Sequence, residues 1–111
     1  MACLCKQGIY ISYIGVIEMK HYIIAKFKEN IDWKSHLEEI TKLFEASTKV
    51  DGVLDIKIFP SNSELSNRSH VMIELQLTPE GLENFDNSPI HSEWKRRFGD
   101  MLEGKTIFDC D

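Results

Sequence analysis

Two histidines, His91 and His21, are the side chains of this sequence best suited to moving protons near neutral pH. His91 ends the segment Ser-Pro-Ile-His, in which the proline is expected to begin a helix. His21 lies on the apolar side of an alternating segment, so we expect it to face the interior. If the two imidazoles meet between a sheet and its helices, they can serve as general acid and base on a carbonyl-rich substrate.

Other roles for His91 have to be weighed against this one. A histidine at a helix start can bond a backbone carbonyl and hold the strand–helix junction, and we consider that structural role first. Metal binding is a third role, but no further ligand of suitable spacing appears. We therefore expect no metal ion and no cofactor.

The sequence lacks the residue patterns that several other kinds of chemistry require. No Gly-rich phosphate loop, no Ser-His-Asp set and no cysteine nucleophile with a placed base is visible. Cys3, Cys5 and Cys110 cannot all pair within one chain, and their spacings are not those of a zinc site or redox motif. These cysteines favour a reducing, cytoplasmic location.

The charge balance argues against polyanionic partners. The chain has 13 Lys and Arg against 18 Asp and Glu, a net charge of −5, which repels nucleic acid and anionic membranes. Lys95, Arg96 and Arg97 form the only basic cluster. It is either a solvated helix face or an anion contact. We expect no nucleic-acid or membrane partner.

Periodicity along the chain predicts alternating strands and helices. Apolar and polar residues alternate, as in strands, over 20–28, 53–59, 71–77 and 105–111. Helices are predicted to begin at Asp32 or Ser35, the latter with capping-box spacing to Glu38, and at Thr78-Pro79 and Ser88-Pro89. The last helix is expected to run through Leu102 and to stop at Gly104. A polar stretch, 60–68, reads as a long loop.

This order of elements is that of an α+β, ferredoxin-like split βαβ fold with a four-stranded antiparallel sheet. Its helices cover one face of the sheet only. The other face would carry Tyr22, Ile24, Phe59 and Met72 among charged residues, a mixed apolar surface that is costly to leave in water. Two copies packed through these faces would close a barrel, so we expect a homodimer, a dimeric α+β barrel.

Residues 1–18 stand apart from the pattern as an N-terminal extension to a domain at 19–111. The apolar run at 9–17 is too short to span a membrane. Two explanations stay open: translation starts at Met19, or the run is an edge strand that pairs with the sheet of its own or a neighbouring subunit.

The sequence resembles the stress-responsive A/B barrel family, Dabb, over residues 19–111. The resemblance rests on the segment at 19–28, the Ser-Pro-Ile-His at 88–91, which matches the family's Pro-x-His element, and the Ile-Phe-Asp at 107–109. It implies a dimeric α+β barrel. The family has mostly uncharacterised bacterial members and a plant branch that includes the polyketide cyclase making olivetolic acid.

The resemblance also implies roles for single residues. The catalytic histidine of that cyclase corresponds to His91, and a second family histidine to His21. The tyrosine that assists catalysis falls on Phe85, which has no hydroxyl to move a proton. A further pocket histidine falls on His70 or Val71, and apolar alternation favours Val71 as the inward-facing position.

We expect a small, apolar or carbonyl-rich ligand in a cavity between sheet and helices. The predicted lining is His21, Ile23, Ala25, Val71, Ile73, Phe85, His91 and Trp94. Because Phe85 lacks the hydroxyl, binding without turnover, or a role as a stable assembly module, is preferred. The alternative is a cofactor-free enzyme, cyclase-like, lyase-like or monooxygenase-like, that uses His91 for catalysis.

Overall fold

The structure of the protein is a computed structural model, which describes residues 10–11 and 17–111. The strands are β1 (Tyr10–Ile11), β2 (Ile17–Phe27), β3 (Val53–Pro60), β4 (Val71–Leu77) and β5 (Leu102–Cys110). The α-helices are α1 (Leu37–Glu45), α2 (Pro79–Asp86) and α3 (Pro89–Phe98). Short 3-10 helices are η1 (Trp33–His36), η2 (Ala46–Lys49) and η3 (Gly99–Met101).

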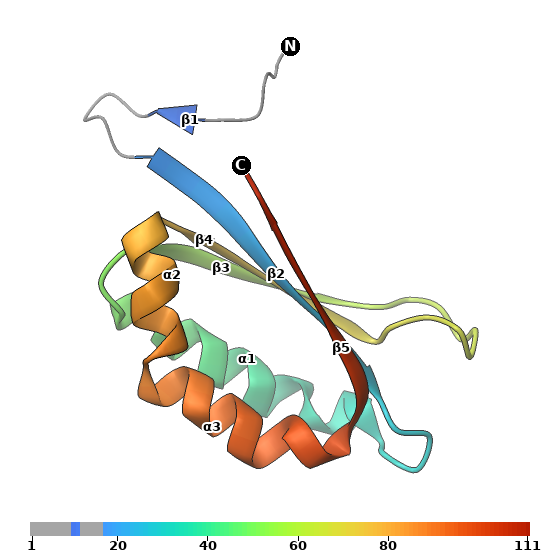
Figure 1. Cartoon of the computed structure of the whole chain (residues 1–111). Coiled ribbons are helices and arrows are strands. Elements are labelled where there is room, and N and C mark those ends of the chain that lie inside the picture. The colour runs from blue at the N-terminus through green and yellow to red at the C-terminus, as the bar shows by residue number, and fades with distance from the viewer. Residues whose placement is uncertain (1–9, 12–16) are drawn as a thin grey trace.

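The main sheet runs in the order β3-β4-β2-β5, and every neighbouring pair is antiparallel. Ile23 of β2 lies opposite Ile73 of β4 on one side and Ile107 of β5 on the other. All three α-helices lie against the same face of this sheet (Figure 1). The predicted ferredoxin-like arrangement with a four-stranded antiparallel sheet is confirmed.

β1 pairs with the first residues of β2, with Tyr10 opposite Glu18. Residues 1–9 and 12–16 lie outside the described part of the chain. The choice between a start at Met19 and a genuine N-terminal edge strand therefore stays a prediction.

The hydrophobic core fills the space between the sheet and the helices. Alternate residues of β2 and β4 are buried there, as their period predicted. The helices contribute large side chains that are at most 1% exposed, namely Ile40, Phe44, Phe85, Trp94 and Phe98. Burying one such side chain stabilises the fold by about 1.5–3 kcal/mol, so this layer fixes how the helices sit on the sheet.

Two of the α-helices begin as the sequence predicts, and one does not. The Thr78 hydroxyl accepts from the Gly81 N–H at 3.0 Å, and Ser88 accepts from the His91 N–H at 3.3 Å. These caps place α2 and α3 as predicted. Ser35 forms no cap: its hydroxyl donates to the Asp32 carbonyl at 2.7 Å, within the 3-10 turn η1. The capping-box prediction was wrong. Asp32, the alternative, immediately precedes η1 without a side-chain cap, and α1 follows from Leu37.

The end of the last helix also differs from the prediction. α3 ends at Phe98, η3 follows, and Leu102 already belongs to β5. Gly104 does not stop a helix; it lies inside β5, opposite Lys26 of β2. Pairing with β2 satisfies the backbone of this segment in the sheet, which outweighs its local helical pattern.

A close approach of two glycines sets the position of α2. Gly52 has a φ of 90°, a conformation that favours glycine, and its carbonyl accepts from the Thr78 N–H at 2.9 Å. A Cβ on Gly81 would lie 2.3 Å from the Gly52 oxygen. Because no larger residue fits, the first turn of α2 lies directly against the turn before β3, and this contact helps to place Phe85.

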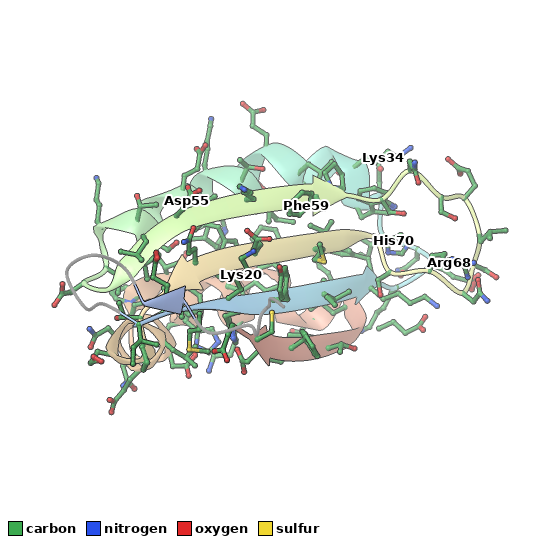
Figure 2. The ribbon with its side chains drawn as sticks, turned by 90° about the horizontal axis from the view of Figure 1, so that it is seen from above. Lys20, Lys34, Asp55, Phe59, Arg68 and His70 are labelled. Carbon is green, nitrogen blue, oxygen red and sulfur yellow. The ribbon has the colours of Figure 1, made fainter. Side chains whose placement is uncertain are left out.

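The opposite face of the sheet has no helix over it (Figure 2). Tyr22 and Ile24 of β2 lie on this open face, since their neighbours in β2 point to the helices. Phe59 and Phe108 are 42% and 56% exposed. Charged residues such as Lys20 lie among them. The open face thus has the mixed apolar character that the sequence predicted.

Candidate functional site

His21 forms a hydrogen bond with a carboxylate from the neighbouring strand. It lies opposite Asp109 in the β2–β5 register, and both residues face the helices. His21 Nδ1 and Asp109 Oδ1 are 2.5 Å apart, with the His21 side chain 8% exposed and the Asp109 side chain 43% exposed. The carboxylate accepts from Nδ1, so in the neutral imidazole the lone pair is on Nε2.

His91 is held in a similar way by the protein backbone. Its Nδ1 donates to the Asp86 carbonyl at 3.0 Å, across the junction between α2 and α3. A bond to a backbone carbonyl is what the structural role of His91 would use, although the junction joins two helices instead of a strand and a helix. The same bond fixes the ring tautomer, so that Nε2 of the neutral ring again carries a lone pair.

Phe85 of α2 is the common neighbour of these two histidines. The ring centroids of Phe85 and His91 are 5.2 Å apart, and those of Phe85 and His21 are 6.3 Å apart. Phe85 is fully buried. The sequence-predicted residues His21 and His91 therefore both lie beside the ring of Phe85. The three residues come from β2, α3 and α2.

The other predicted pocket residues belong to the hydrophobic core. Each of them is at most 2% exposed: Ile23, Ala25, Val71, Ile73 and Trp94. Their side chains fill the space between sheet and helices. Cavities of about 400–470 Å³ formed by the described residues lie elsewhere, on the open face and at the end of the sheet. The assignment of these core residues to a ligand pocket stays a prediction.

His70 and Val71 occupy different environments. Val71 is buried on the helix-covered face, as apolar alternation predicted. His70 precedes β4 at the end of the sheet away from His21, where its Nδ1 accepts from the Phe27 N–H at 2.9 Å. His70 is therefore separate from the group around Phe85.

Asp109 is the site residue that sequence reasoning missed. The Ile-Phe-Asp segment at 107–109 carries part of the family resemblance, but the sequence indicates no partner for its carboxylate. Alternation along β5 puts Ile107 and Asp109 on one face, but only the pairing with β2 brings that face opposite Ile23 and His21. The hydrogen-bonded residues are 88 positions apart in the chain.

Within the residues that the structure describes, no three His, Cys, Asp or Glu side chains come together in a way that could hold a metal ion. No helix of that same part is long and apolar enough to cross a membrane. Cys3 and Cys5, considered above for a zinc site, lie outside the described residues.

Comparison with protein families matches residues 19–111 to the Stress responsive A/B Barrel Domain, Dabb. The chain belongs to the Dabb family. The match covers the whole ferredoxin-like unit from Met19 of β2 to the end of β5. Comparison with curated proteins finds no match for this Dabb chain.

Solved structures share the Dabb fold at low sequence identity. A dimeric ferredoxin-like protein of unknown function from Thermobifida fusca has a TM-score of 0.71 at 10% identity, over 93% of this chain and 91% of that one. A Dabb family protein from Mesorhizobium loti has a TM-score of 0.64 at 13% identity, over 83% and 93%. Hydroxynitrile lyase from Passiflora edulis has a TM-score of 0.66 at 13% identity, over 83% and 90%.

Proposed function

We propose that this Dabb protein is a homodimer in which each copy binds a small, largely apolar ligand beside Phe85, at the edge of the layer between its sheet and helices. The observation that carries the ligand proposal is the arrangement around Phe85. His21 and His91 are both anchored through Nδ1, and Nε2 of neither ring has a hydrogen bond among the described residues. Two hydrogen-bond acceptors beside an apolar ring suit an apolar molecule that carries a hydroxyl.

The open face supports the dimer. Tyr22 and Phe108 contact one another there, with ring centroids 6.4 Å apart, and Phe59 is also exposed. A second copy that covers these side chains buries apolar surface on both partners. The Thermobifida fusca relative is described as dimeric. We expect the interface to bury roughly 1,200 Å² or more in total.

A charged substitution on the open face tests the dimer. Phe108→Asp should convert the dimer to a 12.9 kDa monomer, because a carboxylate would have to lose its water in the interface. Multi-angle light scattering at micromolar concentration measures this. Leu65→Asp is the matched control, since Leu65 is also exposed, at 59%, but lies in the loop before β4. A wild-type protein that is monomeric under these conditions would refute the dimer.

A matched pair of aromatic probes tests the ligand site. 2-Naphthol should bind more tightly than naphthalene, because its hydroxyl can donate to an imidazole Nε2. His21→Leu and His91→Leu should each weaken 2-naphthol binding by up to about tenfold, equivalent to about 1.4 kcal/mol. His36→Leu is the control, because His36 contacts Phe98 instead of Phe85. Equal affinity for both probes, or unchanged binding in both variants, would contradict the proposal.

One observation favours a second candidate, a cofactor-free enzyme. The preference for binding rested on Phe85, which lacks the hydroxyl that would assist His91, whereas the His21–Asp109 pair lies beside the same ring. A carboxylate that orients an imidazole is a common arrangement for general bases. One relative of the same fold is a hydroxynitrile lyase. We propose lyase-type proton transfer by His21 or His91 as the alternative to binding alone.

Mandelonitrile cleavage, followed by the appearance of benzaldehyde, tests the enzyme candidate. Activity above background that falls in both His91→Leu and Asp109→Asn would favour the enzyme. Phe85→Tyr places a hydroxyl beside His91 and should raise such activity, since it adds a second proton-transfer group. Wild-type protein and Phe85→Tyr that both match the uncatalysed rate would count against this lyase reaction and leave binding as the better account.

A further inference from the structure

A cavity of about 470 Å³ lies at the end of the sheet that holds His70. Its walls come from three parts of the chain: the end of β2 with the turn to Lys34, the loop 61–70, and Glu103 of β5. The loop is long and projects past the end of the sheet (Figure 1). None of the residues around Phe85 lines this cavity.

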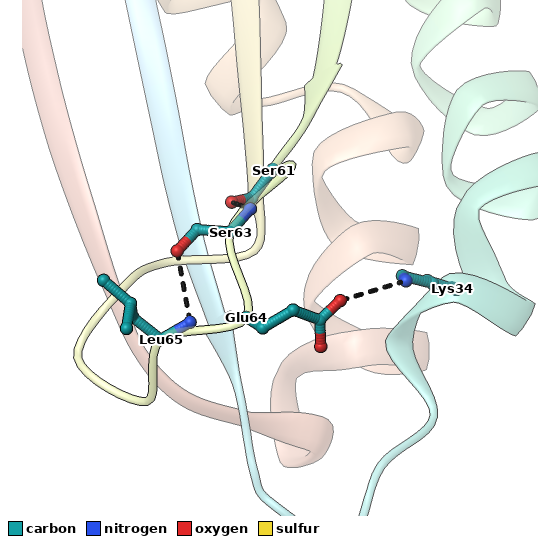
Figure 3. A network of polar contacts seen from close by, with 5 residues as sticks. All are labelled: Lys34, Ser61, Ser63, Glu64 and Leu65. Atoms are coloured by element: carbon teal, nitrogen blue, oxygen red, sulfur yellow. Dashed lines mark hydrogen bonds and ion pairs between the residues drawn. The ribbon is translucent and has the colours of Figure 1, made fainter.

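The loop that forms one wall is shaped by its own serines. Ser61 accepts from the Ser63 N–H at 3.0 Å, and Ser63 accepts from the Leu65 N–H at 3.1 Å. From the opposite wall, the Lys34 ammonium approaches the Glu64 carboxylate at 3.9 Å (Figure 3). The serine contacts shape the loop, and the exposed Lys34–Glu64 pair bridges it to η1 across the cavity.

His70 is fixed in this cavity as a neutral hydrogen-bond donor. Its backbone N–H donates to the Ala25 carbonyl at 2.9 Å, and its Nδ1 accepts from the Phe27 N–H at 2.9 Å. A nitrogen that accepts a hydrogen bond carries no proton, so the proton of the neutral ring lies on Nε2. The ring stacks on Trp33, with centroids 5.1 Å apart and planes 26° apart.

The charges around His70 favour this neutral form. Burial lowers the pKa of His70 below its ordinary value, Lys26 lowers it further, and Glu103 partly opposes them. Lys26 is itself paired with Glu103 at 3.3 Å. The cavity as a whole is lined by three lysines and four carboxylates. An anionic ligand therefore gains no net attraction from the walls.

We propose that this cavity is a second ligand site of the protein, which binds a small uncharged molecule with a flat ring and a carbonyl oxygen. The carbonyl accepts from His70 Nε2, which has no hydrogen bond among the residues that the structure describes. The ring packs against the apolar side chains of the lining, Ile31, Trp33 and Leu65. The site is independent of the one proposed around Phe85.

Benzamide is a suitable probe, because it is flat and neutral and carries one carbonyl. In 1H–15N NMR spectra of the full chain, benzamide should shift the Trp33 indole N–H and the Phe27 amide in a saturable way. Benzoate, which has the same ring but a negative charge, should bind more weakly. Benzamide shifts that do not saturate, or that map only to residues around Phe85, would overturn the proposal.

Substitution of His70 separates its hydrogen bond from its ring stacking. His70→Phe keeps a flat ring on Trp33 but removes Nε2, and should weaken benzamide binding by about tenfold, as expected for one lost hydrogen bond. His36→Phe is the matched control, since His36 does not line the cavity. If His70→Phe does not fold, Trp33→Leu replaces it, and should also weaken binding. Affinity equal to the wild type in the variant that folds would refute the site.

Discussion

The two faces of the sheet contain similar strands but have different surroundings. In β2, Ile23 is 1% exposed beneath the helices, whereas its neighbours Tyr22 and Ile24 lie on the open face with partly exposed side chains. Both faces are rich in apolar side chains. Alternation therefore decides which residues share a face, and only the helices decide which face becomes the interior of one chain.

Histidines at the two ends of the sheet show a second difference. His21 donates through Nδ1 to Asp109, while His70 accepts through Nδ1 from the Phe27 N–H. The free nitrogen, Nε2, is consequently an acceptor at the first end and a donor at the second. One histidine thus offers a hydrogen-bond acceptor and the other a donor, because their partners at Nδ1 differ.

The largest expected loss of stability comes from a substitution on the helix-covered face of the sheet. Trp94→Ala should lower the free energy of unfolding by about 3–5 kcal/mol, because it leaves a cavity among fully packed side chains. Phe59→Ala, the matched change on the open face, should cost far less in the free energy of monomer unfolding, since Phe59 is already 42% exposed. Urea denaturation of both variants in the monomeric Phe108→Asp background measures this difference without a contribution from the interface. Similar losses would mean that the two faces do not differ in this way.

A smaller effect is expected for His91, at the edge of the covered layer. If its bond to the Asp86 carbonyl is its main role, His91→Ala should cost about 0.5–1.5 kcal/mol in unfolding free energy, whatever ligand is present, since the bond is exposed. If His91 serves the ligand or a reaction, the melting temperature should hardly change while 2-naphthol binding or turnover falls. Thermal denaturation and a binding titration of the same variant distinguish these outcomes.

The smallest expected effect on stability near neutral pH concerns Tyr22, on the open face. Burial, then the hydrogen bond to Glu74, raise the pKa of Tyr22 from 10.0 to about 12. Because the folded state keeps this proton while the unfolded state releases it, stability should fall as the pH rises from about 10 to 12 and be unaffected below that range. Ultraviolet titration should show one tyrosine that ionises at higher pH than the others, and this transition should be absent in Tyr22→Phe. A Tyr22 that titrates near 10 would contradict this.

The amino-acid sequence alone was enough to predict the elements that depend on neighbouring residues. Alternation placed β2, β3 and β4, and the Ser and Thr caps before prolines placed the starts of α2 and α3. These patterns are readable because a strand or helix start depends on residues within a few positions of each other. The same local patterns pointed to His91 and His21 as residues worth following.

Tertiary structure decided what depends on register and on partners far along the chain. Residues from Leu102 to Gly104 look helical locally, yet they form strand because β2 offers an edge to pair with. His21 and Asp109 become a pair only through that same register, across 88 positions. The positions of the ring protons in His21 and His70 follow from those contacts. In each case the structure depends on a group far along the chain that lies opposite, and no local pattern in the sequence predicts which group that is.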